Sequence, residues 1–304
     1  MSTTATDTAS WTIRRLLAWT VDHFTQHGLE EPRLCGELLL AHALQRRRIE
    51  LYTRFDEVVS SEGRDRYREL VRRAASREPV AYLVGEKEFF SLPFFVTPSV
   101  LIPRPETELL VELAVDHCKR CSLEQPRILD LGTGSGCLAV TLALHIPKAE
   151  VVASDVSEAA IDVARKNAAR HGVETRVRLI VADGFDLPDG IVPEKGFDVL
   201  LFNPPYVSSE RYEQLDAMIR DFEPAIAVTD GADGLTMYRL IGEKANRVLS
   251  ENGVVMVEVG DGQANDASTA ITSCGQLVHV STFKDRGTDT ERAIVFAHRT
   301  STRG

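Results

Sequence analysis

The clearest fold signal in the chain is the sequence FDVLLFNPPY at residues 197–206. Its first six residues are mostly apolar and rich in β-formers, which is typical of a short strand buried in a parallel sheet. The prolines that follow end the strand, because neither can donate a hydrogen bond to a neighbouring strand. Pro204 also disfavours the helical conformation at Asn203. We therefore expect Asn203 at the carboxyl end of a strand, where open α/β sheets bind their ligands.

Asn203 and its neighbours suit one chemical task, the holding of a flat NH₂ group. The side-chain oxygen of Asn203 and the carbonyl oxygen of Pro204 can accept the two N–H bonds of an amide or exocyclic amine. The ring of Tyr206 can lie against the flat face of that group, and a nitrogen held in this way directs its lone pair at an electrophile. The alternative is a proline-rich turn after a core strand. The predicted catalytic residues are Asn203, Pro204, Pro205 and Tyr206.

Length and composition limit the class of protein. The 304 residues are enough for one large or two ordinary domains, each with a core. A net charge of −10 argues against a surface that binds nucleic acid by neutralising phosphates. Without an apolar span or a signal pattern, the five cysteines are expected to be reduced in a cytoplasmic protein. Cys118 and Cys121 have the spacing of a zinc pair but no second pair accompanies them, so we expect no metal site.

Strand and helix patterns alternate from residue 127 onward. The expected strands are residues 127–131, 151–154, 177–182, 197–202, 253–259, 277–283 and 293–297, with helices at 138–144, 158–170 and 234–249. Such alternation predicts a doubly wound, mostly parallel sheet. Upstream, residues 11–77 have helical periodicity and predict a small bundle without catalytic residues. Two aromatic runs within residues 89–96, separated by a turn-like Ser-Leu-Pro, predict a β-hairpin.

The first strand of this alternating region runs into a glycine-rich turn, GTGSG, at residues 132–136. Such a turn between a strand and a helix lets a ligand approach the backbone closely. The dinucleotide pattern G-x-G-x-x-G would need a glycine at position 137, which is Cys137. The pattern G-x-G-x-G, preceded by Asp130, instead resembles the S-adenosylmethionine loop of Rossmann-like methyltransferases.

Two further strand ends carry residues suited to the same ligand. Asp155 closes the second strand, where a carboxylate can accept hydrogen bonds from both ribose hydroxyls. Residues 183–185 close the third strand, where methyltransferases contact adenine. Each acid alone is more often a helix cap or a loop residue, but three ordered strand ends followed by Asn-Pro-Pro-Tyr on the fourth favour one site. The predicted cofactor-binding residues are Asp130, Gly132, Thr133, Gly134, Ser135, Gly136, Asp155, Asp183, Gly184, Phe185 and Asn203.

Signature segments extend this resemblance over nearly the whole chain. They are EPVAYLVG at 78–85, EF at 88–89, LIPRPETE at 101–108, the glycine loop, NPPY at 203–206, FEP at 222–224 and DGL at 233–235. Together they resemble the HemK/PrmC-type protein glutamine methyltransferases, which methylate peptide chain release factors. The PRPETE run singles out this family, because adenine-N(6) methylases share NPPY. The AIAV at 225–228 and an extension at 288–291 depart from the pattern at the edge of the substrate groove.

The resemblance implies an α/β fold with a Rossmann-like methyltransferase domain, a seven-stranded and mostly parallel sheet, at residues 105–304. A helical substrate-recognition domain at 1–80 and a β-hairpin linker at 81–104 are expected to precede it. The implied methyl donor is S-adenosylmethionine, which leaves as S-adenosylhomocysteine. The implied acceptor is the side-chain amide nitrogen of the glutamine in the Gly-Gly-Gln motif of class-I release factors. No general base is evident, and Glu258, at the end of the fifth strand, is expected to face solvent.

Two alternative functions stay open at this stage. One is an adenine-N(6) methyltransferase acting on RNA or DNA, against which the acidic composition and PRPETE weigh. The other is a non-catalytic scaffold that binds the cofactor and a release factor, against which an intact NPPY weighs. We expect a monomer that binds release factors but neither nucleic acid nor a membrane. The preferred release factor and the roles of Arg104, Glu106 and Glu108 do not follow from the sequence.

Overall fold

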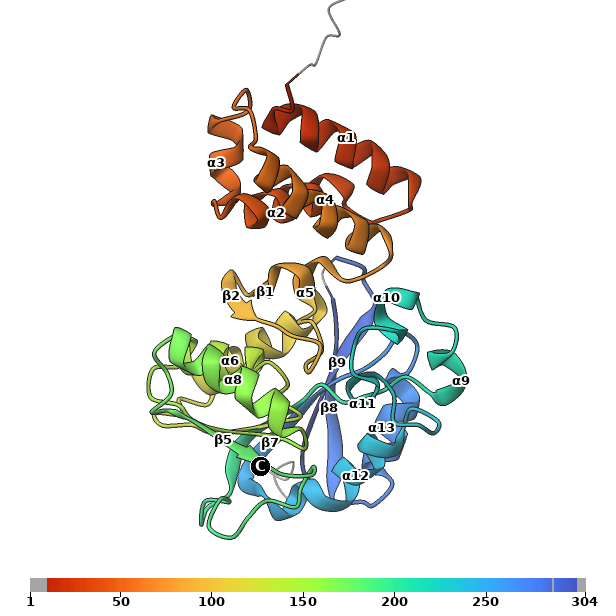
Figure 1. The fold of residues 1–304 in the computed structure, drawn as a ribbon. Helices are drawn as coiled ribbons and strands as arrows, with labels where there is room; N and C mark the ends of the chain where they lie inside the picture. The colour runs from red at the N-terminus through yellow and green to blue at the C-terminus, as the bar shows by residue number, and fades with distance from the viewer. Residues whose placement is uncertain (1–9, 286, 300–304) are drawn as a thin grey trace, which may run out of the picture. The chain divides into compact units, whose positions relative to one another are not determined.

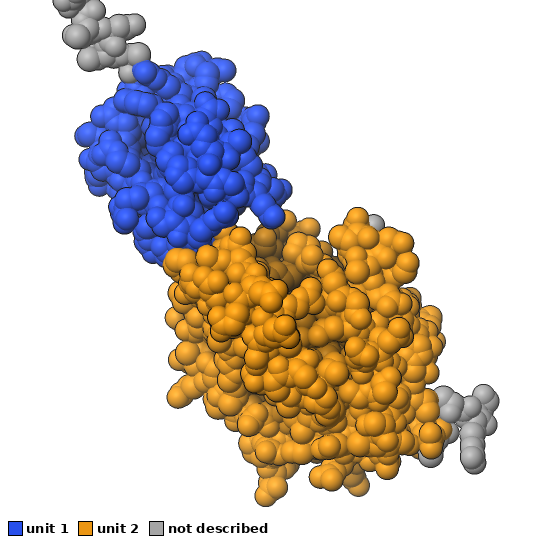
Figure 2. Space-filling model, turned by 90° about the vertical axis from the view of Figure 1, so that its right-hand side faces the viewer, with its two compact units in different colours: residues 1–85 blue, residues 86–304 orange. Residues whose placement is uncertain are grey.

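The computed structural model describes residues 10–285 and 287–299, and the chain divides into two compact units, Met1–Gly85 and Glu86–Gly304 (Figures 1 and 2). The helices of the first unit are α1 (Ile13–Gln26), α2 (Pro32–Leu44), α3 (Arg48–Thr53), α4 (Ser61–Ala75) and α5 (Val80–Val84). This confirms the helical region that the sequence predicts. The predicted domains reach residues 1–9, 286 and 300–304, which lie outside the described residues.

One apolar core holds the first unit together. Phe24 of α1, Leu39 of α2 and Leu51 of α3 are fully buried in it. Tyr67 of α4 is buried with them, and its hydroxyl donates a hydrogen bond of 2.8 Å to the hydroxyl of Thr20. The amphipathic spacing of α1 and α4 accounts for this packing, since each helix turns one apolar stripe inward.

A β-hairpin begins the second unit. Its strands β1 (Glu86–Phe89) and β2 (Leu92–Phe95) pair antiparallel, and Phe90 and Ser91 form the turn with φ values of 52° and 60°. The turn therefore starts one residue before the predicted Ser-Leu-Pro and shares only Ser91 with it, while Leu92 and Pro93 lie within β2. Pro93 is tolerated there because β2 pairs on one side only. Phe89 and Phe94 are buried in the core of the second unit, so the hairpin belongs to that unit.

A seven-stranded sheet forms the centre of the second unit, in the order β5-β4-β3-β6-β7-β9-β8. The strands are β3 (Arg127–Leu131), β4 (Glu150–Asp155), β5 (Val177–Val181), β6 (Phe197–Phe202), β7 (Leu249–Glu258), β8 (Leu277–Lys284) and β9 (Glu291–His298). Of these described strands, β9 alone runs against the others. The strand order reverses between β3 and β6, which is where doubly wound sheets bind ligands. The predicted α/β fold is confirmed.

Helices cover both faces of this sheet (Figure 1). One face carries α6 (Glu108–Arg120), α7 (Cys137–His145) and α8 (Glu158–Arg170), and the other carries α12 (Thr236–Lys244) and α13 (Ala264–Thr272). Short helical turns complete the unit: η1 (Pro105–Thr107), α9 (Ser209–Tyr212), α10 (Ala217–Arg220), α11 (Ala225–Val228) and η2 (Ala245–Arg247). Neighbouring residues of a strand point to opposite faces, as Ile128 and Leu129 do.

Helix α13 was not predicted from the sequence. The helix predicted at 234–249 corresponds to α12, which is shorter than expected. Only Ala264, Ala267 and Ile271 of α13 are buried, so its apolar stripe is too narrow to produce a clear helical pattern. The end of the predicted longer helix is instead η2 and the start of β7. Within residues 10–285 and 287–299, no helix is long and apolar enough to cross a membrane.

Candidate active site

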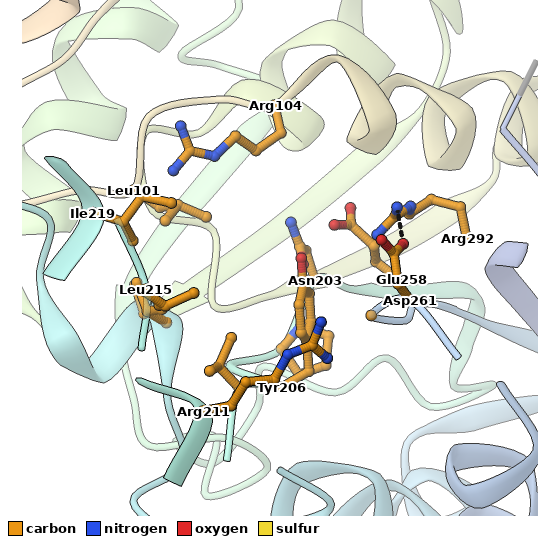
Figure 3. A pocket seen from close by; sticks show the side chains of 15 residues that line it. Leu101, Arg104, Asn203, Tyr206, Arg211, Leu215, Ile219, Glu258, Asp261 and Arg292 are labelled. Carbon is orange, nitrogen blue, oxygen red and sulfur yellow. Dashed lines mark hydrogen bonds and ion pairs between the residues drawn. The ribbon is translucent and has the colours of Figure 1, made fainter. Parts of the chain in front are cut away.

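Two cavities lie at the carboxyl ends of the central strands. The larger, of about 520 Å³, is lined by the glycine loop after β3, by the end of β4 and by Asn203 after β6. The smaller, of about 210 Å³, is bordered by Leu101, Leu215 and Ile219 on one side and by charged residues on the other (Figure 3). Four residues line both cavities, namely Leu101, Arg104, Asn203 and Ala227. Asn203 thus lies where the two cavities share a wall.

The predicted site residues divide between the cavities and the layer beneath them. Those that line the larger cavity are Gly132, Thr133, Gly134, Ser135, Asp155, Asp183, Gly184, Asn203 and Pro205. Those that line the smaller cavity are Asn203, Pro204 and Tyr206. Asp130, Gly136 and Phe185 line neither of the two. Gly136 packs against Ala164 of α8, and Phe185 is buried in the core.

Asp130 lies fully buried beneath the glycine loop. It accepts a hydrogen bond of 2.6 Å from the hydroxyl of Thr133, while its other carboxylate oxygen, Oδ1, has no partner among the described residues. Burial raises the pKa of this carboxyl to about 7. Asp130 therefore supports the loop from below, and the loop residues above it form the cavity wall.

The glycine loop is held in place by its packing. Gly132 has φ +62°, and a Cβ added there would lie 2.9 Å from the ring of Phe202, so only glycine fits. The amide of Asn167, from α8, donates to the carbonyl of Ser135 at 2.8 Å. The same amide pairs with the backbone of Phe95, accepting from its N–H at 2.7 Å and donating to its carbonyl at 3.0 Å. One buried asparagine therefore joins the hairpin to the loop.

Asp155, the last residue of β4, lines the larger cavity, and backbone groups hold its carboxylate in place. The N–H of Gly134 donates to Oδ2 at 2.9 Å, and the N–H of Ser157 donates to Oδ1 at 2.9 Å. Each oxygen keeps a second lone pair for a hydroxyl of a ribose. The cavity volume, the tight glycine loop and this acceptor together fit a nucleoside cofactor.

The carboxamide of Asn203 is part of a hydrogen-bonded chain. Its Nδ2 donates to the hydroxyl of Thr107 at 3.1 Å, and that hydroxyl donates to Oε2 of Glu258 at 2.6 Å. Glu258 is 2% exposed, so the prediction that it faces solvent is wrong. The segment that carries Thr107 covers the end of β7, and burial raises the pKa of Glu258 to about 7.

Tyr206 is held by groups that sequence reasoning did not connect with it. The side-chain amide of Gln263 donates to the carbonyl oxygen of Tyr206 at 2.9 Å. Gly234 has φ +81°, and a Cβ added there would lie 2.5 Å from the same oxygen. This close approach explains the glycine of the DGL segment. Burial raises the pKa of the Tyr206 hydroxyl, so the ring is uncharged over the ordinary pH range.

Comparisons with known proteins identify the family of this chain. A family model described as the PrmC N-terminal domain matches residues 15–85, and one described as a methyltransferase domain matches residues 123–292. The release factor glutamine methyltransferase of Rhodopirellula baltica is 42% identical over 288 residues, which cover 94% of this chain and 96% of the relative. The chain belongs to the release factor glutamine methyltransferase family. The member from Geobacter sulfurreducens is 43% identical over 254 residues, which cover 84% and 86%.

A solved structure of low sequence identity shows the fold alone. A methyltransferase from Pyrococcus furiosus is 20% identical, with a TM-score of 0.50 and coverage of 74% of this chain and 96% of that one. The described residues hold no group of three or more histidine, cysteine or acidic side chains that could bind a metal ion.

The PRPETE segment joins the loop that carries Glu223 to the hairpin turn. Arg104 forms an ion pair with Glu223, which is 5% exposed and also accepts a hydrogen bond of 3.1 Å from the N–H of Ile102. Arg104 thereby closes one wall of both cavities. Glu108 accepts a hydrogen bond of 2.7 Å from the N–H of Phe90 in the hairpin turn. Glu106 is partly buried.

Proposed function

We propose that this protein transfers a methyl group from S-adenosylmethionine to the side-chain amide nitrogen of the glutamine in the Gly-Gly-Gln motif of class-I release factors. The observation that supports this most is the position of Asn203 in the wall shared by two cavities. Its amide nitrogen is engaged by Thr107, and no donor among the described residues contacts its side-chain oxygen. That oxygen is available for an N–H of the substrate.

The larger cavity is the proposed cofactor site. The backbone of residues 132–135, the carboxylate of Asp155 and residues 183–184 would hold the cofactor there. When bound, S-adenosylmethionine supplies a methyl group on a positively charged sulfur, which makes that methyl electrophilic. Asp155 would accept the ribose hydroxyls on lone pairs that its backbone partners leave unused. Asp130, Gly136 and Phe185 support this wall from behind.

The smaller cavity is the proposed site of the glutamine side chain. The side-chain oxygen of Asn203 and the carbonyl oxygen of Pro204 would accept the two amide hydrogens, and the ring of Tyr206 would lie against the amide plane. Positioning of this kind contributes about 7–11 kcal/mol when reacting atoms are well aligned. The attacking nitrogen becomes acidic once it carries the methyl, and it then loses its proton to water. The chain would act as a monomer and without nucleic acid.

The first unit is the proposed recognition domain for the release factor. Four of its large apolar side chains are exposed, namely Trp19, Ile49, Tyr52 and Val58. Such side chains supply contact area to a protein partner. Ile49→Lys should raise KM for an intact release factor several-fold and leave kcat, and KM for a short Gly-Gly-Gln peptide, unchanged. An equal loss with the peptide would contradict this role.

The decisive experiment offers labelled S-adenosylmethionine with four substrates in parallel. They are a class-I release factor, the same factor with the glutamine of its Gly-Gly-Gln motif changed to alanine, bulk RNA and DNA. Label on the first substrate alone is the expected result. Label on RNA or DNA would favour the adenine-N(6) alternative, and cofactor binding without any transfer would favour the scaffold.

A further inference from the structure

Three segments that are far apart in the sequence meet at the hydroxyl of Thr107. This residue ends η1, is 3% exposed, and lies between Asn203 after β6 and Glu258 at the end of β7. The two hydrogen bonds of its hydroxyl are 3.1 Å to Nδ2 of Asn203 and 2.6 Å to Oε2 of Glu258. Thr107 lines the larger cavity and Glu258 the smaller one, but the proposed reaction requires neither of them to touch the substrate.

While Glu258 is ionised, the hydrogen bonds that link Asn203, Thr107 and Glu258 can have only one set of donors and acceptors. A carboxylate only accepts, so the single proton of the Thr107 hydroxyl goes to Glu258. The hydroxyl must then accept from Asn203, and only the NH₂ end of the carboxamide can donate. The carboxamide of Asn203 therefore cannot rotate by 180° without losing this bond and bringing two acceptors together.

We propose that Thr107 and Glu258 are positioning residues that hold the Asn203 carboxamide with its oxygen toward the substrate amide. The inference rests on the proposed function, because it concerns the same glutamine site. Without the hydroxyl of Thr107, the carboxamide of Asn203 would turn its NH₂ group toward the substrate for part of the time. Two NH₂ groups then face one another, and the attacking nitrogen loses an acceptor.

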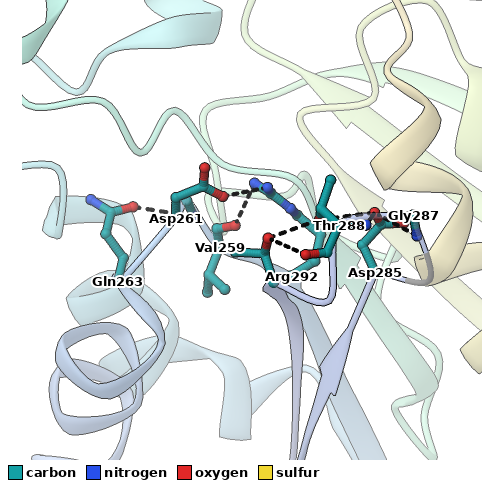
Figure 4. Close-up of polar contacts among 9 residues, drawn as sticks. Val259, Asp261, Gln263, Asp285, Gly287, Thr288 and Arg292 are labelled. Carbon is teal, nitrogen blue, oxygen red and sulfur yellow. Dashed lines mark hydrogen bonds and ion pairs between the residues drawn. The ribbon is translucent and has the colours of Figure 1, made fainter.

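The arginines near Glu258 are paired with other acids, so Glu258 is hydrogen-bonded to Thr107 instead. Arg292, on β9, donates to the carbonyl of Val259 at 3.2 Å and forms an ion pair with Asp261 (Figure 4). Arg104 is paired with Glu223. Arg292 and Arg104 favour the ionised form of Glu258 while Glu106 opposes it, and none of the three forms an ion pair with it among the described residues. The carboxylate is thus kept near cations but bonded to the hydroxyl.

The test compares Thr107→Val, which keeps the shape but removes the hydroxyl, with Thr107→Ser, which keeps the hydroxyl. Thr107→Val should lower kcat for release factor methylation by at least about tenfold, since it removes an oriented hydrogen bond from the site. Thr107 also lines the larger cavity, but valine keeps its shape, so the cofactor Kd, measured by calorimetry, should rise far less than kcat falls. Thr107→Ser should recover kcat to within about threefold of the parent protein. Equal losses in both variants would mean that packing, rather than the hydroxyl, matters, and would overturn the proposal.

The two hydrogen bonds that link Asn203, Thr107 and Glu258 are called the relay below. A matched control separates the loss of the relay from a general loss of stability. Thr141 is also fully buried, but its hydroxyl has no partner among the described residues and it lines neither cavity. Thr141→Val should leave kcat at the parental value and raise Tm slightly, because it removes an unpaired buried hydroxyl. A kcat loss in Thr141→Val as large as that in Thr107→Val would overturn the proposal.

A double variant separates this inference from the proposed function. If Thr107 acts through Asn203, adding Thr107→Val to Asn203→Ala should lower kcat no further. Additive losses would overturn the relay while leaving the role of Asn203 intact. Near-parental kcat in Asn203→Ala alone would overturn the proposed role of Asn203 and the relay with it.

Discussion

Two carboxylates, Asp130 and Glu258, are buried on either side of the site, and each accepts a hydrogen bond of 2.6 Å from a threonine. The partner of Asp130 is Thr133, three residues away, so the bond stays within one loop. The partner of Glu258 is Thr107, 151 residues away, and the bond joins η1 to the end of β7. Under the proposed function, the first bond shapes the backbone of the cofactor site, whereas the second orients a side chain toward the substrate.

This contrast predicts that the two regions separate binding from turnover. The glycine loop and Asp155 should determine cofactor affinity, and the ends of β6 and β7 should determine the rate of transfer. Four predictions, made with five variants, test this separation, beginning with the one expected to have the largest effect.

Asn203→Ala should lower kcat by at least about a hundredfold, which corresponds to about 2.7 kcal/mol of lost transition-state stabilisation. The substrate nitrogen loses one acceptor and is free to rotate. The cofactor Kd should change little, because Asp155 and the glycine loop lie on other strand ends. Transfer of labelled methyl to a release factor measures the rate, with Asn265→Ala, an exposed asparagine of α13, as the control. Near-parental transfer would mean that residues 203–206 are only a turn after a core strand.

Asp155→Ala should raise the cofactor Kd by about tenfold or more, since hydrogen bonds to a charged acceptor contribute about 1.5–3 kcal/mol each. At saturating cofactor, kcat should fall much less than in Asn203→Ala. Calorimetry measures the affinity, with Asp162→Ala as a control at an exposed ion pair of α8. Unchanged affinity would remove Asp155 from the site, and tighter binding of NAD than of S-adenosylmethionine would overturn the cofactor assignment.

As the pH changes, Asp130 and Glu258 should affect the free energy of unfolding alike, but only Glu258 should affect kcat. Burial raises the pKa of both to about 7, so the folded state binds their protons more tightly than the unfolded state does. The free energy of unfolding should therefore fall as the pH rises from about 4 to about 7. Over the upper part of this range kcat should rise, because ionised Glu258 accepts from Thr107.

Substitution tells the two carboxyls apart. Asp130→Asn and Glu258→Gln should each flatten the dependence of unfolding free energy on pH, but only Glu258→Gln should remove the acid limb of kcat. Denaturant unfolding and initial rates, measured at the same pH values, give both quantities. An acid limb of kcat that persists in Glu258→Gln would contradict this assignment.

Thr133→Val should have the smallest effect, a loss of about 1–3 kcal/mol of unfolding free energy, because it leaves buried Asp130 without its donor. The cofactor Kd should rise several-fold, since the loop backbone is less well held. Thermal unfolding and calorimetry measure the two changes. A fall in kcat at saturating cofactor as large as that of Thr107→Val would erase the contrast between the two threonines.

The sequence by itself predicted the elements that depend on neighbouring residues. Short apolar runs rich in β-formers predicted the strands, and FDVLLFNPPY predicted a strand followed at its carboxyl end by Asn203. The glycine turn predicts a cofactor loop. Where the local pattern is weak the prediction failed, as at α13 and at the hairpin turn of Phe90 and Ser91. Turns formed by two left-handed residues without glycine carry little signal in the sequence.

Only the tertiary structure decided what lies behind the site. Glu258 was expected in solvent because a charged residue at a strand end is normally exposed, but the segment carrying Thr107 buries it. The residues that hold Tyr206 and Arg104, namely Gln263 and Glu223, likewise come from distant segments. Sequence patterns report the periodicity of one element, whereas a hydrogen bond between residues 107 and 258 depends on how several elements pack together.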